Sequence, residues 1–204
     1  MKLLIFDFDG TIADTKAIYY KSIFDVLKKL GYSYKKMDKA IEYGLSLRKT
    51  LAKLGFSKIT IWFYKKKIMK NVTSYSEKVK KCKDVDSIKE IKQDKILVSN
   101  SLKEMIIPIL KHFKLTGEFK EIYGADDFSD KTDFIKKYIK EHNLKKKDVY
   151  YIADRAADVK AARKTGCQSI IILGKCAWDS RKKILKEKPD FLIDSIEDLQ
   201  KLKL

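Results

Sequence analysis

The sequence predicts an α/β fold: a doubly wound parallel sheet, Rossmann-like in arrangement, with a helical insert after its first strand. Three observations support this fold class. Short β-rich runs recur along the chain, and they are apolar almost without alternation, as expected of strands covered on both faces. Amphipathic helical stretches separate most of these runs, which is typical of βαβ units. One long gap without a strand follows the first run, and it predicts the insert.

Six runs are predicted strands, beginning with KLLIF at residues 2–6. This run has no polar alternation, so we expect a strand in the interior of the sheet. The second run, KILVS, comes only at residues 95–99, and four more follow at closer spacing. They lie at residues 120–124, 148–153, 169–173 and 190–193.

Amphipathic patterns between the later strands predict the helices that cover the sheet. The stretch MIIPILKHF at 105–113 places apolar residues at helical spacing, and residues 133–142 repeat the pattern. A third helix is predicted over 157–166, where Gly166 is placed as a C-terminal stop.

The long gap between the first two strands predicts a separate helical unit. We expect the core to consist of residues 1–14 and 90–204, and the insert to span 15–89. Residues 59–63 are sufficiently β-branched that a strand is an alternative there. The predicted helices of the insert are residues 18–31, 47–55 and 59–72.

The length and the N-terminal sequence limit the class of protein. A chain of 204 residues is long enough for one well-buried domain, or for a core that carries a smaller insert. No apolar run approaches the roughly 20 residues that a membrane span needs. The N-terminus has one Lys and a short apolar run followed by carboxylates, which is not a secretory signal. These features predict a cytoplasmic protein, a monomer or homodimer, without a membrane partner.

The three cysteines are Cys82, Cys167 and Cys176, an odd number without CxxC spacing. We expect them to be small buried hydrophobic side chains in a reducing compartment, rather than metal ligands or disulfides.

The positive charge is concentrated in the insert. The chain has a net charge of +18, and residues 15–89 hold 20 basic and 6 acidic side chains. This excess has three interpretations: a lysine-rich composition of the thermophile type, a lid that steers a small anionic substrate, or a nucleic-acid surface with interspersed tyrosines such as Tyr19 and Tyr20. The chain has 46 basic residues but only four Arg, which disfavours nucleic acid because Arg makes the bidentate phosphate contacts.

Polar side chains follow three of the predicted strands, where ligands bind in open parallel sheets. Asp7 and Asp9 come after the first strand, and Asp154 comes after the fourth. A lysine, Lys131, begins the helix between the third and fourth strands. The predicted site consists of Asp7, Asp9, Gly10, Thr11, Ser99, Asn100, Lys131, Asp154 and Asp158.

So many carboxylates at one edge require a cation, and a hard oxygen-ligated ion such as Mg²⁺ is the natural choice. We assign the metal site to Asp7, Asp9 and Asp154, with the side chain of Asp9 off the metal, and Asp158 in support. The cation lowers the cost of ionising Asp7 beside its acidic neighbours.

This arrangement suits phosphoryl transfer. Asp7 can attack phosphorus and form an aspartyl-phosphate, while Asp9 protonates the leaving oxygen and later deprotonates water. Gly10 allows a sharp turn close to the phosphate. The predicted phosphate-binding groups are Thr11, Ser99, Asn100 and Lys131.

DFDGT at 7–11, Ser99 after an apolar strand, Lys131, and DRAAD at 154–158 resemble the four motifs of the haloacid dehalogenase-like (HAD) hydrolase superfamily. The resemblance implies that the insert is a cap domain. Within it, YGLSLRKTLAKLG at 43–55 is similar to the specificity loop of phosphoglycolate phosphatase-like and β-phosphoglucomutase-like members. The similarity implies that Arg48 reaches toward an anionic or polar part of the substrate.

Asp9 places the chain nearer to the phosphatases and phosphomutases, since the dehalogenase branch lacks an acid at this position. Two departures from the family pattern are Thr132 where relatives often have Pro, and Ala153 in place of Gly. Arg155 adds a cation beside the acids, either to bind substrate or to pair with a nearby acid.

The sequence therefore predicts a Mg²⁺-dependent phosphatase acting on a small phosphorylated metabolite of the phosphoglycolate type. The alternatives are a phosphomutase of the same family, and a nucleic-acid-associated protein that trims phosphate ends and uses the basic cap.

Overall fold

The computed structural model describes residues 2–33, 35–37, 47–202 and 204 of the chain. It contains a six-stranded sheet in the order β5-β4-β1-β6-β7-β8, in which every neighbouring pair is parallel. Each of the six predicted runs holds one strand, which confirms the doubly wound α/β fold. The strands are β1 (Leu3–Phe6), β4 (Asp94–Val98), β5 (Glu121–Tyr123), β6 (Val149–Ala153), β7 (Gln168–Ile172) and β8 (Phe191–Ile193).

Strand β1 lies between β4 and β6, and all four of its residues are buried. Its side chains alternate between two separate cores. Leu4 and Phe6 pack in the core that includes α5, while Leu3 and Ile5 pack in the core that includes α6 and α7. A run without polar residues is required here because both faces of the strand are covered.

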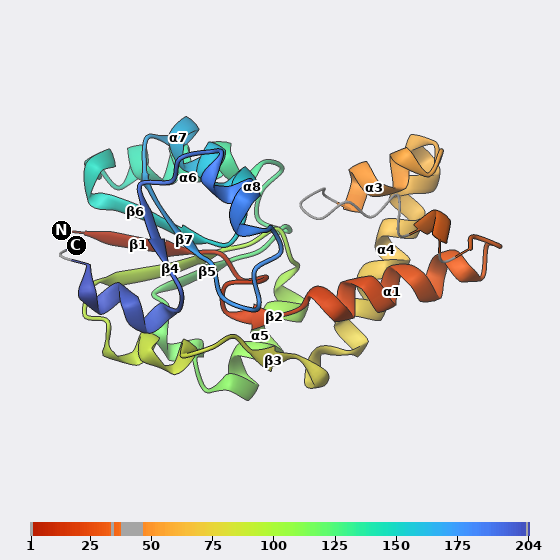
Figure 1. Ribbon diagram of the computed structural model, residues 1–204, viewed down its shortest axis with the longest axis horizontal. Helices are drawn as coiled ribbons and strands as arrows, with labels where there is room; N and C mark the ends of the chain where they lie inside the picture. Colours follow the sequence, from red (N-terminus) through yellow and green to blue (C-terminus); the bar gives the residue numbers. More distant parts are fainter. Residues whose placement is uncertain (1, 34, 38–46, 203) are drawn as a thin grey trace.

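Helices cover both faces of the sheet, with α6, α7 and α8 on one side and α5 on the other (Figure 1). The helix α7 ends where the sequence predicts, because Gly166 adopts a left-handed conformation (φ 83°) that stops the helix. These helices are α5 (Lys103–Phe113), α6 (Lys131–Glu141), α7 (Ala156–Thr165) and the short α8 (Arg181–Leu185).

The helices of the predicted insert lie together at one end of the molecule, away from the sheet (Figure 1). They are α1 (Lys16–Lys28), α3 (Leu47–Lys53) and α4 (Lys58–Ser74), and α4 packs against the other two. Residues 59–63 belong to α4, so the alternative of a strand at this point is wrong. Ser57 caps this helix by accepting a hydrogen bond from the Thr60 amide at 3.2 Å.

A short antiparallel ribbon of β2 (Ala13–Asp14) and β3 (Lys80–Lys81) joins the helical end to the sheet. After β3 the chain forms η2 (Val85–Glu90), which packs against η5 (Ile196–Lys201). The sequence does not predict this ribbon, because two-residue strands carry no periodic pattern. The other 3-10 turns are η1 (Ser76–Lys78), η3 (Thr116–Glu118) and η4 (Lys146–Asp148).

All three cysteines are buried, as predicted, but two of them are bonded. Cys82 and Cys176 form a disulfide with their Cα atoms 5.8 Å apart, whereas Cys167 is a free thiol. The prediction of three unpaired cysteines is therefore wrong for this pair. The partners are 94 residues apart and meet only because the loop after β7 folds back beside β3, which sequence spacing does not reveal.

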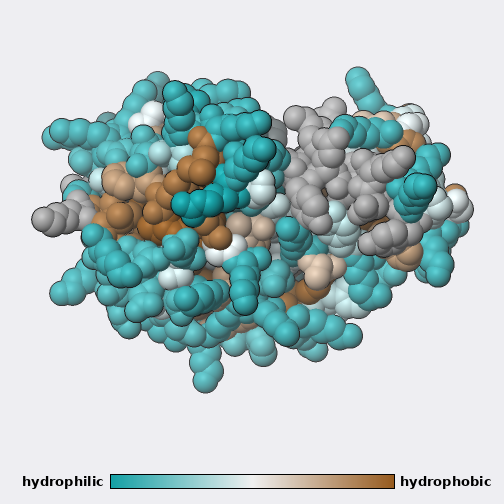
Figure 2. Space-filling view, viewed as in Figure 1, coloured by the Kyte–Doolittle hydropathy of each residue, from teal (hydrophilic) through white to brown (hydrophobic). Residues whose placement is uncertain are grey.

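Hydrophilic side chains predominate on the face shown in Figure 2, and hydrophobic ones gather mainly over the part that holds the sheet. All five lysines of α4 are exposed to solvent. Among the described residues, no helix is long and apolar enough to cross a membrane.

Candidate active site

Three carboxylates meet at the carboxyl edge of the sheet. Asp7 follows β1, Asp154 follows β6, and Asp158 lies in the first turn of α7. One oxygen from each lies within 4.8 Å of the others, and all three residues are buried. Neighbouring strands β1 and β6 end at the same edge, which is why residues nearly 150 positions apart come together.

Lys131 brings a cation to this cluster. Its Nζ lies 2.9 Å from Oδ1 of Asp7, and both side chains are almost fully buried. Lys131 is the first residue of α6, and the side chain of Asp130 caps this helix by accepting hydrogen bonds from the amides of Thr132 and Asp133. The Phe8 amide donates a hydrogen bond to Oδ1 of Asp7, so one hydrogen bond and one ion pair fix the orientation of the carboxylate.

The Asp9 carboxylate faces other partners. Thr15 Oγ1 donates to its Oδ1 at 2.7 Å, and Ser101 Oγ donates to its Oδ2 at 2.6 Å. A longer bond of 3.4 Å comes from Ser99. Burial, reinforced by the charge of Asp7, raises the pKa of Asp9 above its ordinary value. A raised pKa favours a carboxyl group that can donate a proton.

Gly10 allows Asp154 and Trp178 to approach the backbone closely. Its φ is +76°, and a Cβ at this position would collide with Oδ2 of Asp154 and with the indole of Trp178. The Trp178 amide in turn donates to Oδ2 of Asp154 at 2.6 Å. Glycine is therefore required both by conformation and by space.

Two carboxyl groups of this cluster have raised pKa values. Burial raises the pKa of Asp154 well above its ordinary value. Burial and the charge of Asp7 raise the pKa of Asp158 to about 6, although Tyr151 donates a hydrogen bond to this carboxylate. Oδ1 of Asp154 is buried and has no hydrogen-bond partner within the described ranges of the chain. A set of hard oxygen ligands with one buried oxygen unsatisfied fits Mg²⁺.

The remaining predicted residues lie in different settings. Ser99 accepts a hydrogen bond from the Ser101 amide at 3.0 Å. Thr11 is fully buried, and its hydroxyl has no hydrogen-bond partner among the residues that the structure describes. Asn100 is exposed. Arg48 belongs to α3, but its side chain lies outside the described residues.

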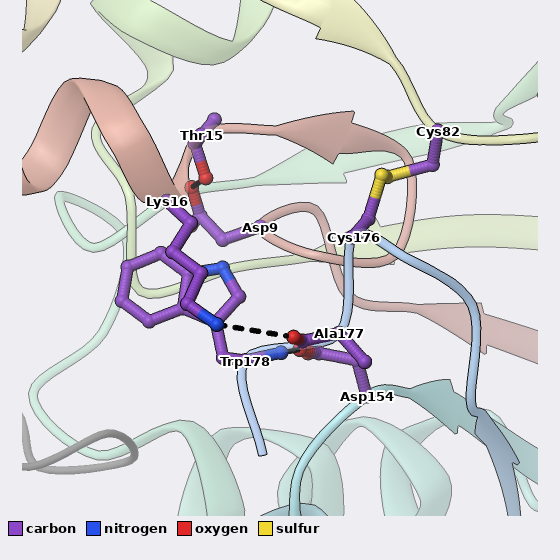
Figure 3. The surroundings of a disulfide bond; sticks show 8 residues. All are labelled: Asp9, Thr15, Lys16, Cys82, Asp154, Cys176, Ala177 and Trp178. Atoms are coloured by element: carbon purple, nitrogen blue, oxygen red, sulfur yellow. Dashed lines mark hydrogen bonds between the residues drawn. A yellow bond between two sulfur atoms is a disulfide. The ribbon is translucent and has the colours of Figure 1, made fainter. Parts of the chain in front are cut away.

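Sequence reasoning missed the loop at residues 174–179. It follows β7 and carries Cys176, bonded to Cys82, and Trp178, whose amide binds Asp154 (Figure 3). Trp178 also packs edge-to-face on Tyr19 of α1, with ring centroids 5.5 Å apart. No motif marks the loop, and the only available signal is its place after the carboxyl end of a strand.

The comparisons with known proteins agree with this fold. The model of the haloacid dehalogenase-like hydrolase family matches residues 4–172, so the chain belongs to this family of enzymes. The match includes every predicted site residue and confirms the resemblance that the motifs indicate.

The alignments with individual relatives cover nearly the whole chain. A phosphoglycolate phosphatase of Aquifex aeolicus is 25% identical over 210 residues, covering 99% of this chain and 96% of its own. The protein PpaX of Caldanaerobacter subterraneus, named as a pyrophosphatase, is 26% identical over 212 residues, with coverage of 98% and 93%. A haloacid dehalogenase-like hydrolase of Streptococcus pneumoniae shares the fold with a TM-score of 0.81 at 19% identity, with coverage of 98% and 96%. Family and relatives together support an enzyme that hydrolyses phosphate monoesters.

Proposed function

We propose that the protein is a Mg²⁺-dependent phosphatase that hydrolyses a small phosphorylated metabolite of the phosphoglycolate type through an aspartyl-phosphate. The buried cluster of Asp7, Asp154 and Asp158, with Lys131 at 2.9 Å from Asp7, is the observation that carries this proposal. The names of the relatives, a phosphoglycolate phosphatase and a pyrophosphatase, support a small phosphorylated compound as the substrate class.

In the first step the Asp7 carboxylate attacks phosphorus, and the bond between phosphorus and the leaving oxygen breaks. Asp9 gives its proton to that oxygen, and its raised pKa supports this role. In the second step Asp9 takes a proton from water, which attacks phosphorus, releases inorganic phosphate and restores Asp7. Lys131 stabilises charge on the phosphoryl oxygens, and Thr11, Ser99 and Asn100 are the other proposed phosphate-binding groups.

We assign the metal to the cluster of Asp7, Asp154 and Asp158. This assignment replaces Asp9 of the predicted set with Asp158, because the Asp9 side chain accepts hydrogen bonds from Thr15 and Ser101. When bound, Mg²⁺ supplies charge neutralisation for the phosphoryl group. The contribution of the chain is to keep these carboxylates buried and fixed in position. Trp178 serves this purpose through its amide, which holds Asp154.

We further propose that α1, α3 and α4 act as a cap over this edge. The sequence predicts a cap of residues 15–89. The pairing of β2 with β3 supports a return of the chain from the cap to the core near Lys80–Lys81. Arg48, in α3, stays a candidate for substrate specificity. A cytoplasmic location and a monomeric or dimeric state also stay predictions.

Phosphate release across a panel of phosphorylated metabolites tests the proposal. We expect turnover that requires Mg²⁺ and is abolished by Asp7→Asn, because the amide is a poor nucleophile and a poor ligand. Asp133→Asn is the matched control, since this carboxyl is exposed on α6. Full activity of Asp7→Asn, or activity in excess chelator, would contradict the phosphatase. Conversion of a sugar phosphate without phosphate release would identify the phosphomutase instead.

A further inference from the structure

Arg155 lies beside the acid cluster but forms no salt bridge with it among the described residues. It directly follows Asp154, and its guanidinium interacts electrostatically with Asp154 and Asp158 and, less strongly, with Asp7 and Asp9. In the part of the chain that the structure describes, no salt bridge or side-chain hydrogen bond holds this guanidinium, and its Nε is buried without a partner. Of the two roles that the sequence left open for Arg155, pairing with a nearby acid is thus not observed.

The guanidinium rests on the ring of Trp178, with its central carbon 4.0 Å from the ring centroid. Such stacking orients an arginine and leaves the edge of its fork available for an oxyanion. Trp178 is itself held by the hydrogen bond from its backbone amide to Asp154. Its ring also contacts Tyr19 and lies close to the backbone of Gly10. The loop that carries it is further tied by the disulfide of Cys176 (Figure 3).

The Trp178 indole Nε1 is a second buried donor without a partner among the described residues. Two such donors on stacked side chains, beside the nucleophile, are unusual, because buried polar groups are nearly always hydrogen-bonded. Each leaves a donor for a ligand to satisfy, and an anion suits both because neither group accepts hydrogen bonds.

We propose that Arg155, held on Trp178, binds a second oxyanion in the leaving group of the substrate. The inference rests on the proposed phosphatase function and narrows its substrate class. Because Arg155 adjoins Asp154, the oxyanion must lie only a few bonds from the reacting phosphorus. Small phosphate esters with a carboxylate on the neighbouring carbon fit this requirement, and so do diphosphates. Arg155 and Trp178 are then specificity-determining residues of the core, whereas Arg48 belongs to the cap.

A pair of substrates that differ in one group tests this assignment. The first is 2-phosphoglycolate, and the second is 2-hydroxyethyl phosphate, in which a neutral hydroxymethyl group replaces the carboxylate. Inorganic pyrophosphate is a third substrate, and it separates a phosphoryl oxyanion from a carboxylate. kcat and KM are measured for the parent, Arg155→Met, Arg155→Lys, Trp178→Leu and Arg48→Ala.

We expect the parent to prefer one of the two charged substrates over 2-hydroxyethyl phosphate. Arg155→Met should lower kcat/KM for the preferred charged substrate at least tenfold more than for the neutral one. Arg155→Lys should recover part of the loss because it keeps the charge, and Trp178→Leu should cause a smaller loss in the same direction. Far-UV circular dichroism and Mg²⁺ titration calorimetry show whether each variant keeps the fold and the acid cluster.

Two results would overturn the inference while leaving the phosphatase intact. Equal losses on charged and neutral substrates would mean that Arg155 only balances the charge of the acid cluster. The preference for the charged substrate over 2-hydroxyethyl phosphate could instead be lost in Arg48→Ala and kept in Arg155→Met. That result would assign binding of the second oxyanion to the cap. A parent that releases phosphate from none of a broad panel of esters would instead refute the proposed function itself.

Discussion

Removal of the disulfide between Cys82 and Cys176 should destabilise the protein strongly. The bond joins residues 94 positions apart, so in the unfolded chain it closes a loop of that length. Restricting a loop of about 100 residues lowers the entropy of the unfolded state by an amount worth about 4.7 kcal/mol at 25 °C. The double variant Cys82→Ala/Cys176→Ala should therefore lose about 3–5 kcal/mol of unfolding free energy.

The loss should be accompanied by weaker metal binding. Cys82 follows β3, and its amide donates to the carbonyl of Ile12 at 3.0 Å, while Cys176 lies two residues before Trp178. Without the bond, the loop that directs the Trp178 amide at Asp154 is less restrained. We expect the affinity for Mg²⁺ to fall together with the stability.

Urea unfolding followed by circular dichroism measures the change in free energy. Cys167→Ala is the matched control, because it removes a buried thiol that is not bonded. Parent protein in dithiothreitol should reproduce the unfolding of the double variant. A double variant within about 1 kcal/mol of the parent would refute the entropic argument, and three free thiols in the purified parent would refute the disulfide itself.

Three further predictions concern the acid cluster. Asp9→Asn should still accept a phosphoryl group on Asp7 from 4-nitrophenyl phosphate, whose leaving group needs little protonation, and the adduct should persist in a mass spectrum; a parent-like rate with no adduct would remove Asp9 from its role. Gly10→Ala should abolish turnover, because its Cβ would displace Asp154, and a crystal structure with Asp154 unmoved would contradict this reason. Folding raises the pKa of Asp158 from 3.8 to about 6, so in chelator the folded state binds a proton more tightly than the unfolded state. This group should therefore stabilise the fold below pH 4, and the contribution should disappear as the pH rises through 6. Urea unfolding at pH 4.0 and 6.5 should show the change, and Asp158→Asn should reduce it; an equal change in both proteins would assign it to other groups.

The sheet could be predicted because its strands are buried on both faces. Residues 149–153 of β6 are all buried, so no polar position interrupts the apolar run. The acid cluster could also be predicted, because the topology of a parallel sheet brings the ends of β1 and β6 to one edge. In both cases the pattern reports directly on burial or on strand direction.

Features created by contacts between loops could not be predicted. The ribbon of β2 and β3 has two residues in each strand, too few for periodicity. Ser101 follows the predicted Ser99-Asn100 pair, yet its bond to Asp9 depends on how the chain turns after β4. No sequence motif marks Trp178, because its contacts with Asp154 and Gly10 exist only once the loop after β7 folds back.

The surroundings of Asp7 and Asp9 explain why two acids stand so close together. Asp7 points toward Lys131, Asp154 and Asp158, where a cation can keep it ionised as a nucleophile. Asp9 points toward neutral hydroxyl groups in a buried setting, and its pKa rises. Asp7 therefore faces a cation, while Asp9 is favoured as a proton donor. Neighbouring carboxyl groups with opposed environments are the arrangement that general acid and nucleophile require at the same pH. The short segment of Asp7, Asp9 and Gly10 thus carries both the proposed nucleophile and the proposed general acid.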